Sequence, residues 1–141
     1  MYNASGILKT KYFTSLKAVL SDDVGVFKNY VPNDLTTDNY VLISDVQQTD
    51  YSTINKHDVK AFITIGIYTK AIPENSGVTM EAIADAIFSL YPTPQSYPTL
   101  SGYQVCSLQL ESDNELTVDL GNSITFINRT IIFSHILNKL N

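Results

Sequence analysis

The side chains of this 141-residue chain that we consider first as candidates for chemistry are His57, His135, Cys106 and Arg129. A catalytic acid, base or nucleophile needs a second group beside it that activates or orients it. His57 lies next to Asp58 in a polar stretch, where a solvated loop histidine is the ordinary interpretation. His135 lies among Ile and Phe residues and is expected in the core or at an interface. Neither histidine therefore predicts a catalytic site.

Cys106 is the only cysteine, and its apolar neighbours predict that it behaves as a small buried hydrophobe. One cysteine excludes an internal disulfide and a cysteine-rich zinc site, and two histidines without a spaced carboxylate do not make a metal site. The sequence also has no phosphate-binding glycine loop, nucleophile elbow or zinc-protease motif. We therefore expect no catalytic residue, no metal and no cofactor.

Arg129 is the only arginine, and Ile127 and Ile131 are its expected same-face neighbours in a strand. An unpaired guanidinium is costly to bury, so Arg129 should be paired or lie at the rim of an interface. We interpret it first as an interface organiser. An acidic partner in the same chain would keep the pairing but remove the argument for an interface.

Composition predicts one globular domain spanning residues 1–141. The chain is 44% hydrophobic and 16% charged, with 9 Lys plus Arg against 14 Asp plus Glu. A net charge of −5 argues against a protein that coats nucleic acid. The charged fraction is below the roughly 25% of ordinary soluble domains, which suggests that other subunits cover part of the surface. We expect no signal peptide, and no apolar run is long enough to span a membrane.

Hydrophobic periodicity predicts two helices and several strands. The helices are expected at residues 5–21 and from Asn75 or Ser76 to Pro92, and residues 22–39 as a helix exit followed by a loop. Strands are expected at residues 40–46, 59–69, 102–111 and 123–137, and a short strand or an arm at 115–120, with turns at 112–114 and at 121–122. The order α-β-β-α-β-β predicts an α+β domain: an antiparallel sheet of four or more strands with two helices on one face.

The last strand is apolar on both faces, so both faces must be covered. One face carries Ile124, Phe126, Ile132 and Ile136, and the other carries Ile127, Ile131, Phe133 and Leu137. The two helices can cover only one of these faces. A partner subunit is the simplest cover for the other.

The connection at residues 49–58 is polar and about ten residues long, where tight hairpins use two to five. Long loops in compact domains are often functional. We expect this loop to project from the sheet and to reach a neighbouring chain. The interface candidates are therefore Tyr51, Asn55 and His57, together with Arg129.

The layout resembles the small neck and tail-completion proteins of tailed phages, which include tail terminators and head–tail joining proteins. The resemblance is carried by the following passages: the helix ending at Leu20-Ser21-Asp22-Asp23, the strand at residues 38–45, the long strand at 59–68, the helix Met80-Glu81-Ala82-Ile83-Ala84-Asp85-Ala86-Ile87 and the closing strand. The family usually has a proline before its first strand, where this chain has Asp38-Asn39.

This resemblance implies a virion structural protein, assembled in the host cytoplasm, that forms a hexameric or dodecameric ring at the head–tail junction or tail end. Its partners would be portal, adaptor or tail proteins, with DNA passing through the lumen without sequence-specific binding and with no membrane. Six copies would carry about −30 formal charges, and such a lumen would repel the passing DNA.

Other classes of function stay open. An apolar-ligand binding module would enclose a pocket between the helices and a curved sheet and would purify as a monomer with its ligand. An enzyme using His135 or Cys106 would have a closed pocket joining that residue to a carboxylate. An accessory interaction protein, such as a toxin–antitoxin component, is the remaining alternative.

Overall fold

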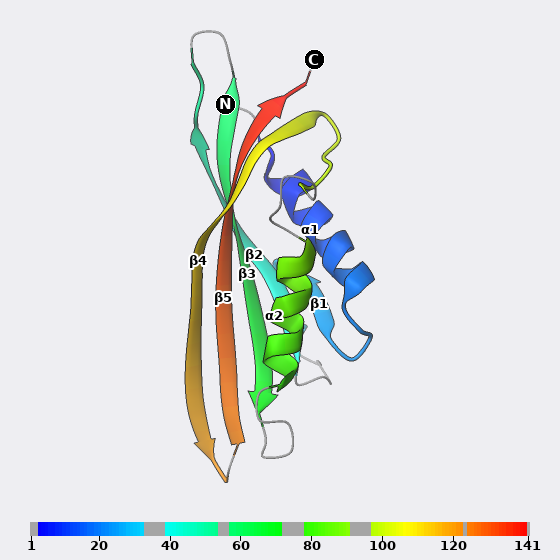
Figure 1. The fold of residues 1–141 in the computed structure, drawn as a ribbon, viewed down its shortest axis with the longest axis vertical. Helices are drawn as coiled ribbons and strands as arrows, with labels where there is room; N and C mark the ends of the chain where they lie inside the picture. Colours follow the sequence, from blue (N-terminus) through cyan, green and yellow to red (C-terminus); the bar gives the residue numbers. More distant parts are fainter. Residues whose placement is uncertain are drawn as a thin grey trace.

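The computed structural model describes residues 3–32, 39–53, 57–71, 78–90, 97–122 and 124–140. Two helices lie on one face of a strongly twisted five-stranded sheet (Figure 1). The elements in chain order are α1 (Ser5–Val19), β1 (Gly25–Lys28), β2 (Tyr40–Asp50), β3 (Asp58–Ala71), α2 (Val78–Leu90), β4 (Tyr103–Gly121) and β5 (Ile124–Lys139). The α+β class, both helices and the helix-covered face are as predicted. The expected helix cap at Asn75 or Ser76 lies outside the described residues.

The sheet is mixed, which corrects the antiparallel prediction. Its order is β1-β2-β3-β5-β4, and β1 pairs with β2 in parallel while every other pair is antiparallel. The short strand β1 was missed in the sequence because four residues are too few to show a period. The observed order is therefore α-β-β-β-α-β-β.

Strand β4 corrects a second prediction, the turn at residues 112–114. The chain continues through Ser112, Asp113 and Asn114 as one strand of 19 residues paired with β5 along its length. Register shifts between Val105 and Ser107 and between Leu110 and Ser112 absorb extra residues as bulges. Turn-forming residue types can thus lie in a strand when a long partner supplies its hydrogen bonds. The predicted turn at Gly121-Asn122 is confirmed, and both residues have positive φ angles of 81° and 55°.

Strands β2 and β3 are longer than predicted, and their pairing continues to Asp50 opposite Val59. The backbone N–H of Tyr51 then donates to the carbonyl oxygen of Asp58 over 2.9 Å. The connection is therefore residues 51–57, shorter than the ten residues expected. It remains longer than a tight hairpin turn.

The core lies between the helices and one sheet face. In β3 the alternation is as predicted, with Val59, Ala61, Ile63, Ile65 and Ile67 buried. Apolar side chains from both helices meet this face, and the largest are fully buried. These helix residues are Leu8, Tyr12, Leu16, Met80, Ile83, Ala84 and Ile87.

Candidate assembly surfaces

The sheet face opposite the helices is covered by no element of the described chain (Figure 1), and we call it the outer face. Register places alternate residues of β3 and β5 on it, among them Phe62, Ile132 and Ile136. These side chains are half-buried, whereas Ile131, Phe133 and Leu137 on the helix side are buried. Strand β5 is thus apolar on both faces, and the helices cover only one of these faces, as predicted.

Three aromatic side chains lie in a row on the outer face beside Gly66. The rings of Tyr40 and Tyr68 stack with centroids 4.8 Å apart, and Phe27 meets Tyr40 edge-on at 6.2 Å. A Cβ on Gly66 would lie 2.9 Å from Cε2 of Tyr68, so the tyrosine ring uses the space that a side chain would take. Gly66 therefore marks a point of close packing within β3. Burial raises the pKa of Tyr40, and Tyr68 adds to this rise.

The end of the β4–β5 hairpin extends past α2 (Figure 1) and exposes apolar side chains. Leu116, Val118 and Leu120 are 62%, 47% and 58% exposed. Leu116 pairs with Asn128 and Val118 with Phe126, so both lie on the outer face. Adjacent exposed apolar residues on a projecting hairpin are typical of a contact surface.

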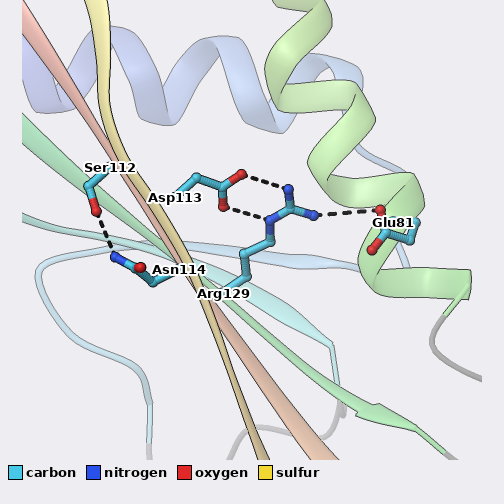
Figure 2. A network of polar contacts seen from close by, with 5 residues as sticks. All are labelled: Glu81, Ser112, Asp113, Asn114 and Arg129. Atoms are coloured by element: carbon cyan, nitrogen blue, oxygen red, sulfur yellow. Dashed lines mark hydrogen bonds and ion pairs between the residues drawn. The ribbon is translucent and has the colours of Figure 1, made fainter.

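Arg129 is held by two acidic residues of its own chain, as Figure 2 shows. Its Nε and Nη2 donate to the two carboxylate oxygens of Asp113 on β4 over 2.8 and 2.7 Å. Its Nη1 lies 3.5 Å from Oε2 of Glu81 on α2, and the guanidinium lies 5.8 Å from the ring centroid of Phe88. The hydrogen bond from Arg129 holds the pKa of Asp113 below its usual range, and this carboxylate raises the pKa of Arg129.

The prediction that Arg129 is paired is thus confirmed, but its partners belong to its own chain and not to a neighbouring subunit. Because Asp113 and Glu81 belong to the same chain, the lone-cation argument for an interface at Arg129 no longer applies. The arrangement instead fastens α2 to strands β4 and β5. Sequence reasoning missed Asp113 because it had been assigned to a turn.

His135 is fully buried, which confirms the core interpretation. Its Nδ1 lies 3.1 Å from the carbonyl oxygen of Ala61, and its Nε2 lies 2.6 Å from the hydroxyl of Tyr12. A carbonyl only accepts, so Nδ1 carries the proton and Nε2 accepts from Tyr12. Burial lowers the pKa of His135 to about 4, so the ring is neutral at pH 7. Its described contacts are those of a structural histidine.

The loop candidates lie at the β2–β3 end of the sheet. Tyr51 is 52% exposed and His57 is exposed, while Asn55 lies outside the described residues. Asp50 accepts hydrogen bonds from the backbone and hydroxyl of Ser52, which hold its pKa below the usual range. The loop candidates and Arg129 lie in different regions of the sheet.

Cys106 is exposed, which corrects the expectation of a buried cysteine. It falls at the register shift between Val105 and Ser107 on the edge strand, where it no longer points into the core. Among the described residues, no group of three or more His, Cys, Asp and Glu side chains could hold a metal ion. In the same ranges, neither helix has the length and apolar character of a membrane span.

A cavity of about 470 Å³ lies beside the C-terminal end of α1, between it and α2. Its lining includes Val19, Leu20, Val24, Ile83 and Ala86. It lies at the rim of the helix layer, whereas the space between helices and sheet is filled by the core. This arrangement differs from the enclosed pocket that an apolar-ligand module would use.

No family model matches the sequence, and no curated protein matches it. The fold is similar to that of a chain in the solved virion of a native gene transfer agent (GTA) particle, with a TM-score of 0.64. The two chains share 17% sequence identity, and the match covers 94% of this chain and 96% of the other. The similarity of fold therefore extends over nearly the whole chain.

Proposed function

We propose that this chain is a structural protein of a phage-like virion and that it acts by assembling into a ring at the head–tail junction or the tail end. The observation that carries the proposal is the similarity of fold, along nearly the full length of both chains, to a component of a gene transfer agent virion. Ring formation and the place in the neck are drawn from the resemblance in layout. In this role the protein holds partners in place and carries out no reaction.

The outer face supports an assembly role. The side chains of Phe62, Ile132 and Ile136 on this face are apolar and half-buried. A partner that covers them removes their remaining apolar surface from water, which favours association. The neighbouring hairpin adds the exposed Leu116 and Val118 to the same side of the molecule. We propose that a virion partner, a ring mate or an adjoining portal, adaptor or tail protein, covers this surface.

The net charge is compatible with a DNA conduit. Each copy carries −5, and a ring would therefore carry a negative field that disfavours binding of the DNA backbone. DNA that passes through the ring without being held there needs no contact between the protein and its bases. We propose that DNA passes through the ring lumen and is not read by it.

The test is the mass and shape of the purified protein in solution. Native mass spectrometry should give one closed oligomer, and negative-stain images should show rings with a central channel. The substitution Ile132→Asn on the outer face should shift the protein toward folded monomer. The matched control is Val19→Asn, an exposed apolar residue on α1, which should assemble like the wild type. A wild-type protein that stays monomeric at all accessible concentrations would refute the ring.

A further inference from the structure

Strand β1 is an open edge of the sheet, and no other strand of the described chain lies beyond it (Figure 1). The N–H groups of Gly25 and Asn29 donate to carbonyl oxygens of β2 and of the residue before it, over 3.1 and 2.9 Å. The backbone groups of successive strand residues point to opposite edges, so Val26 and Lys28 turn their N–H and C=O groups outward. These outward groups have no hydrogen-bond partner within the described ranges. An extended segment of another chain can pair with them.

Two hollows lie along this edge. The larger has a volume of about 350 Å³, and its lining includes Tyr30, which is 74% exposed. The smaller, of about 240 Å³, lies beside the start of β1. Both are lined by Lys17, Val26 and Phe27. Val26 lies on the helix side of the sheet and Phe27 on the outer face, so a space that touches both lies beyond the strand edge, where an added strand would run.

The border of the hollows is basic. Helix α1 and strand β1 contain lysines and no Asp or Glu. Lys17 and Lys28 place their ammonium groups 5.3 and 5.9 Å from the ring centroid of Phe13 on α1. Lys9, one turn before Phe13, donates to the side chain of Asn29 over 2.8 Å. These contacts are with neutral groups, so the positive charges remain available to an acidic partner.

The side chain of Lys28 leaves the edge open. A lysine on an edge strand often serves to prevent pairing with another chain. Here the side chain of Lys28 lies on the helix side, and its ammonium donates to the hydroxyl of Thr10 on α1 over 3.2 Å. It is thus turned back onto the helix. Lys28 therefore adds charge beside the edge without covering the backbone groups that a partner strand needs.

We propose that the β1 edge binds an extended acidic segment of another protein, which adds to the sheet as a further strand. Side chains of such a strand alternate between the two faces of the sheet. On the helix side they would lie beside Lys17 and Lys28, which favours Asp or Glu. On the outer face they would lie beside the ring of Phe27, which favours apolar residues. This inference goes beyond the proposed function, because neither ring formation nor the cover of the outer face requires it.

The chemistry of the edge favours a peptide over a nucleic acid. The outward C=O groups of Val26 and Lys28 need N–H donors at the spacing of a strand, and a peptide backbone supplies them whereas a phosphate backbone does not. Asp22 lines the smaller hollow, and its carboxylate repels a chain of phosphates. The net charge of −5 adds to this repulsion.

Binding of a synthetic peptide tests the proposal. The probe is a fluorescein-labelled peptide of alternating Glu and Val, and its fluorescence anisotropy is measured against the wild-type chain. Lys17→Glu and Lys28→Glu should each raise the dissociation constant roughly tenfold. The matched control is Lys11→Glu, which reverses a charge on the same helix outside the lining of both hollows and should leave the dissociation constant unchanged. Circular dichroism melts check that each variant is folded.

Amide hydrogen exchange separates strand addition from charge attraction alone. With saturating peptide, the N–H groups of Val26 and Lys28 should exchange roughly tenfold more slowly, whereas those of Gly25 and Asn29, which already donate to the β2 side, should change little. The same peptide with every backbone nitrogen methylated keeps its charges but has no N–H donors. It should bind roughly tenfold more weakly.

Four results would overturn the proposal. They are no binding of the peptide, binding without slower exchange at Val26 and Lys28, equal binding of the methylated peptide, and tighter binding of single-stranded DNA than of the peptide. Protection of both amides in the wild type without peptide would assign the edge to a second copy of this chain and would also overturn it. The measurement applies equally to a monomer and to a ring. A wild-type protein that stays monomeric therefore refutes the ring alone.

Discussion

The hydroxyl of Tyr12 donates a 2.6 Å hydrogen bond to Nε2 of His135, and this contact joins the first helix to the last strand. The same imidazole donates from Nδ1 to the carbonyl oxygen of Ala61 on β3. Both rings are fully buried, and they meet edge-on with centroids 5.5 Å apart. The neutral side chain of His135 thus connects α1, β3 and β5, which are distant in the sequence.

Replacing Tyr12 by Phe should lower the free energy of unfolding by about 1–2 kcal/mol, because the buried Nε2 of His135 then lacks a donor. Urea unfolding followed by circular dichroism gives this value. The control is Tyr103→Phe, which removes only a long, exposed hydrogen bond of 3.3 Å to the carbonyl oxygen of Asn3. Equal stability of the two variants would contradict the role assigned to this contact.

The stability of the protein should fall as the pH drops from about 6.5 towards 4. Burial lowers the pKa of His135 to about 4 from an ordinary value of 6.5, so below pH 6.5 the unfolded chain binds the proton first. The lost stability at pH 5 should be about 2 kcal/mol, from 1.36 kcal/mol per pKa unit. In His135→Gln this loss should vanish. Parallel pH curves for the two proteins would show that His135 is not the titrating group.

Asp113→Asn should destabilise the folded chain by about 1–2 kcal/mol, because it removes a charge-assisted, two-point contact to Arg129. Glu81→Gln is the matched control: that carboxylate is 64% exposed and 3.5 Å from the guanidinium, so its loss should cost well under 1 kcal/mol. Thermal unfolding at pH 7 compares them. A larger effect from Glu81 would reverse this order. Because the pKa of Asp113 is lowered, the contribution of this pair should disappear as the pH falls through its folded value.

Gly66→Ala should destabilise the fold by about 1 kcal/mol because the new methyl group must displace the ring of Tyr68 from its stack on Tyr40. In a Tyr68→Ala background the same change should cost nothing, which a double-mutant cycle measures. Gly6→Ala is the opposite control. A Cβ there meets nothing within 4 Å and should stabilise α1 by about 0.5 kcal/mol. An equal cost of Gly66→Ala with and without Tyr68 would rule out the ring as its cause.

The β2–β3 connection should matter for assembly more than for folding. Replacing residues 52–57 by Asn-Gly leaves both strands and the Tyr51–Asp58 backbone contact in place. We expect a folded monomer that assembles poorly, measured by analytical ultracentrifugation, because the shortened loop no longer reaches a neighbouring chain. Assembly at the wild-type level would show that the loop has no such contact.

The sequence predicted both helices and strand β3 well because each has a clear period over ten or more residues. The buried face of β3, from Val59 to Ile67, was foreseen residue by residue. The strand Gly25–Lys28 was not, because it has only four residues and its parallel pairing with β2 depends on tertiary structure. Local pattern and long-range pairing thus contribute separately to this fold.

The polar contacts likewise depend on long-range pairing that the local sequence does not reveal. Ser112-Asp113-Asn114 has turn-forming chemistry, and only the pairing with β5 reveals that Asp113, opposite Ile131, lies on the same face as Arg129 and diagonal to it. Likewise, nothing local in the sequence joins Tyr12 to His135. A basic residue in a strand did predict that a partner exists, but not that the partner belongs to the same chain.

The strand order has a consequence for biosynthesis. Strand β5 is made last, yet it lies between β3 and β4 in the sheet. A nascent chain that lacks residues 124–139 therefore has two strands with no common neighbour and cannot close its core. The five-stranded sheet can be completed only after residues 124–139 have left the ribosome, and contacts of such long sequence separation slow folding. Premature termination within the last strand would thus yield an aggregating fragment and no partly functional subunit.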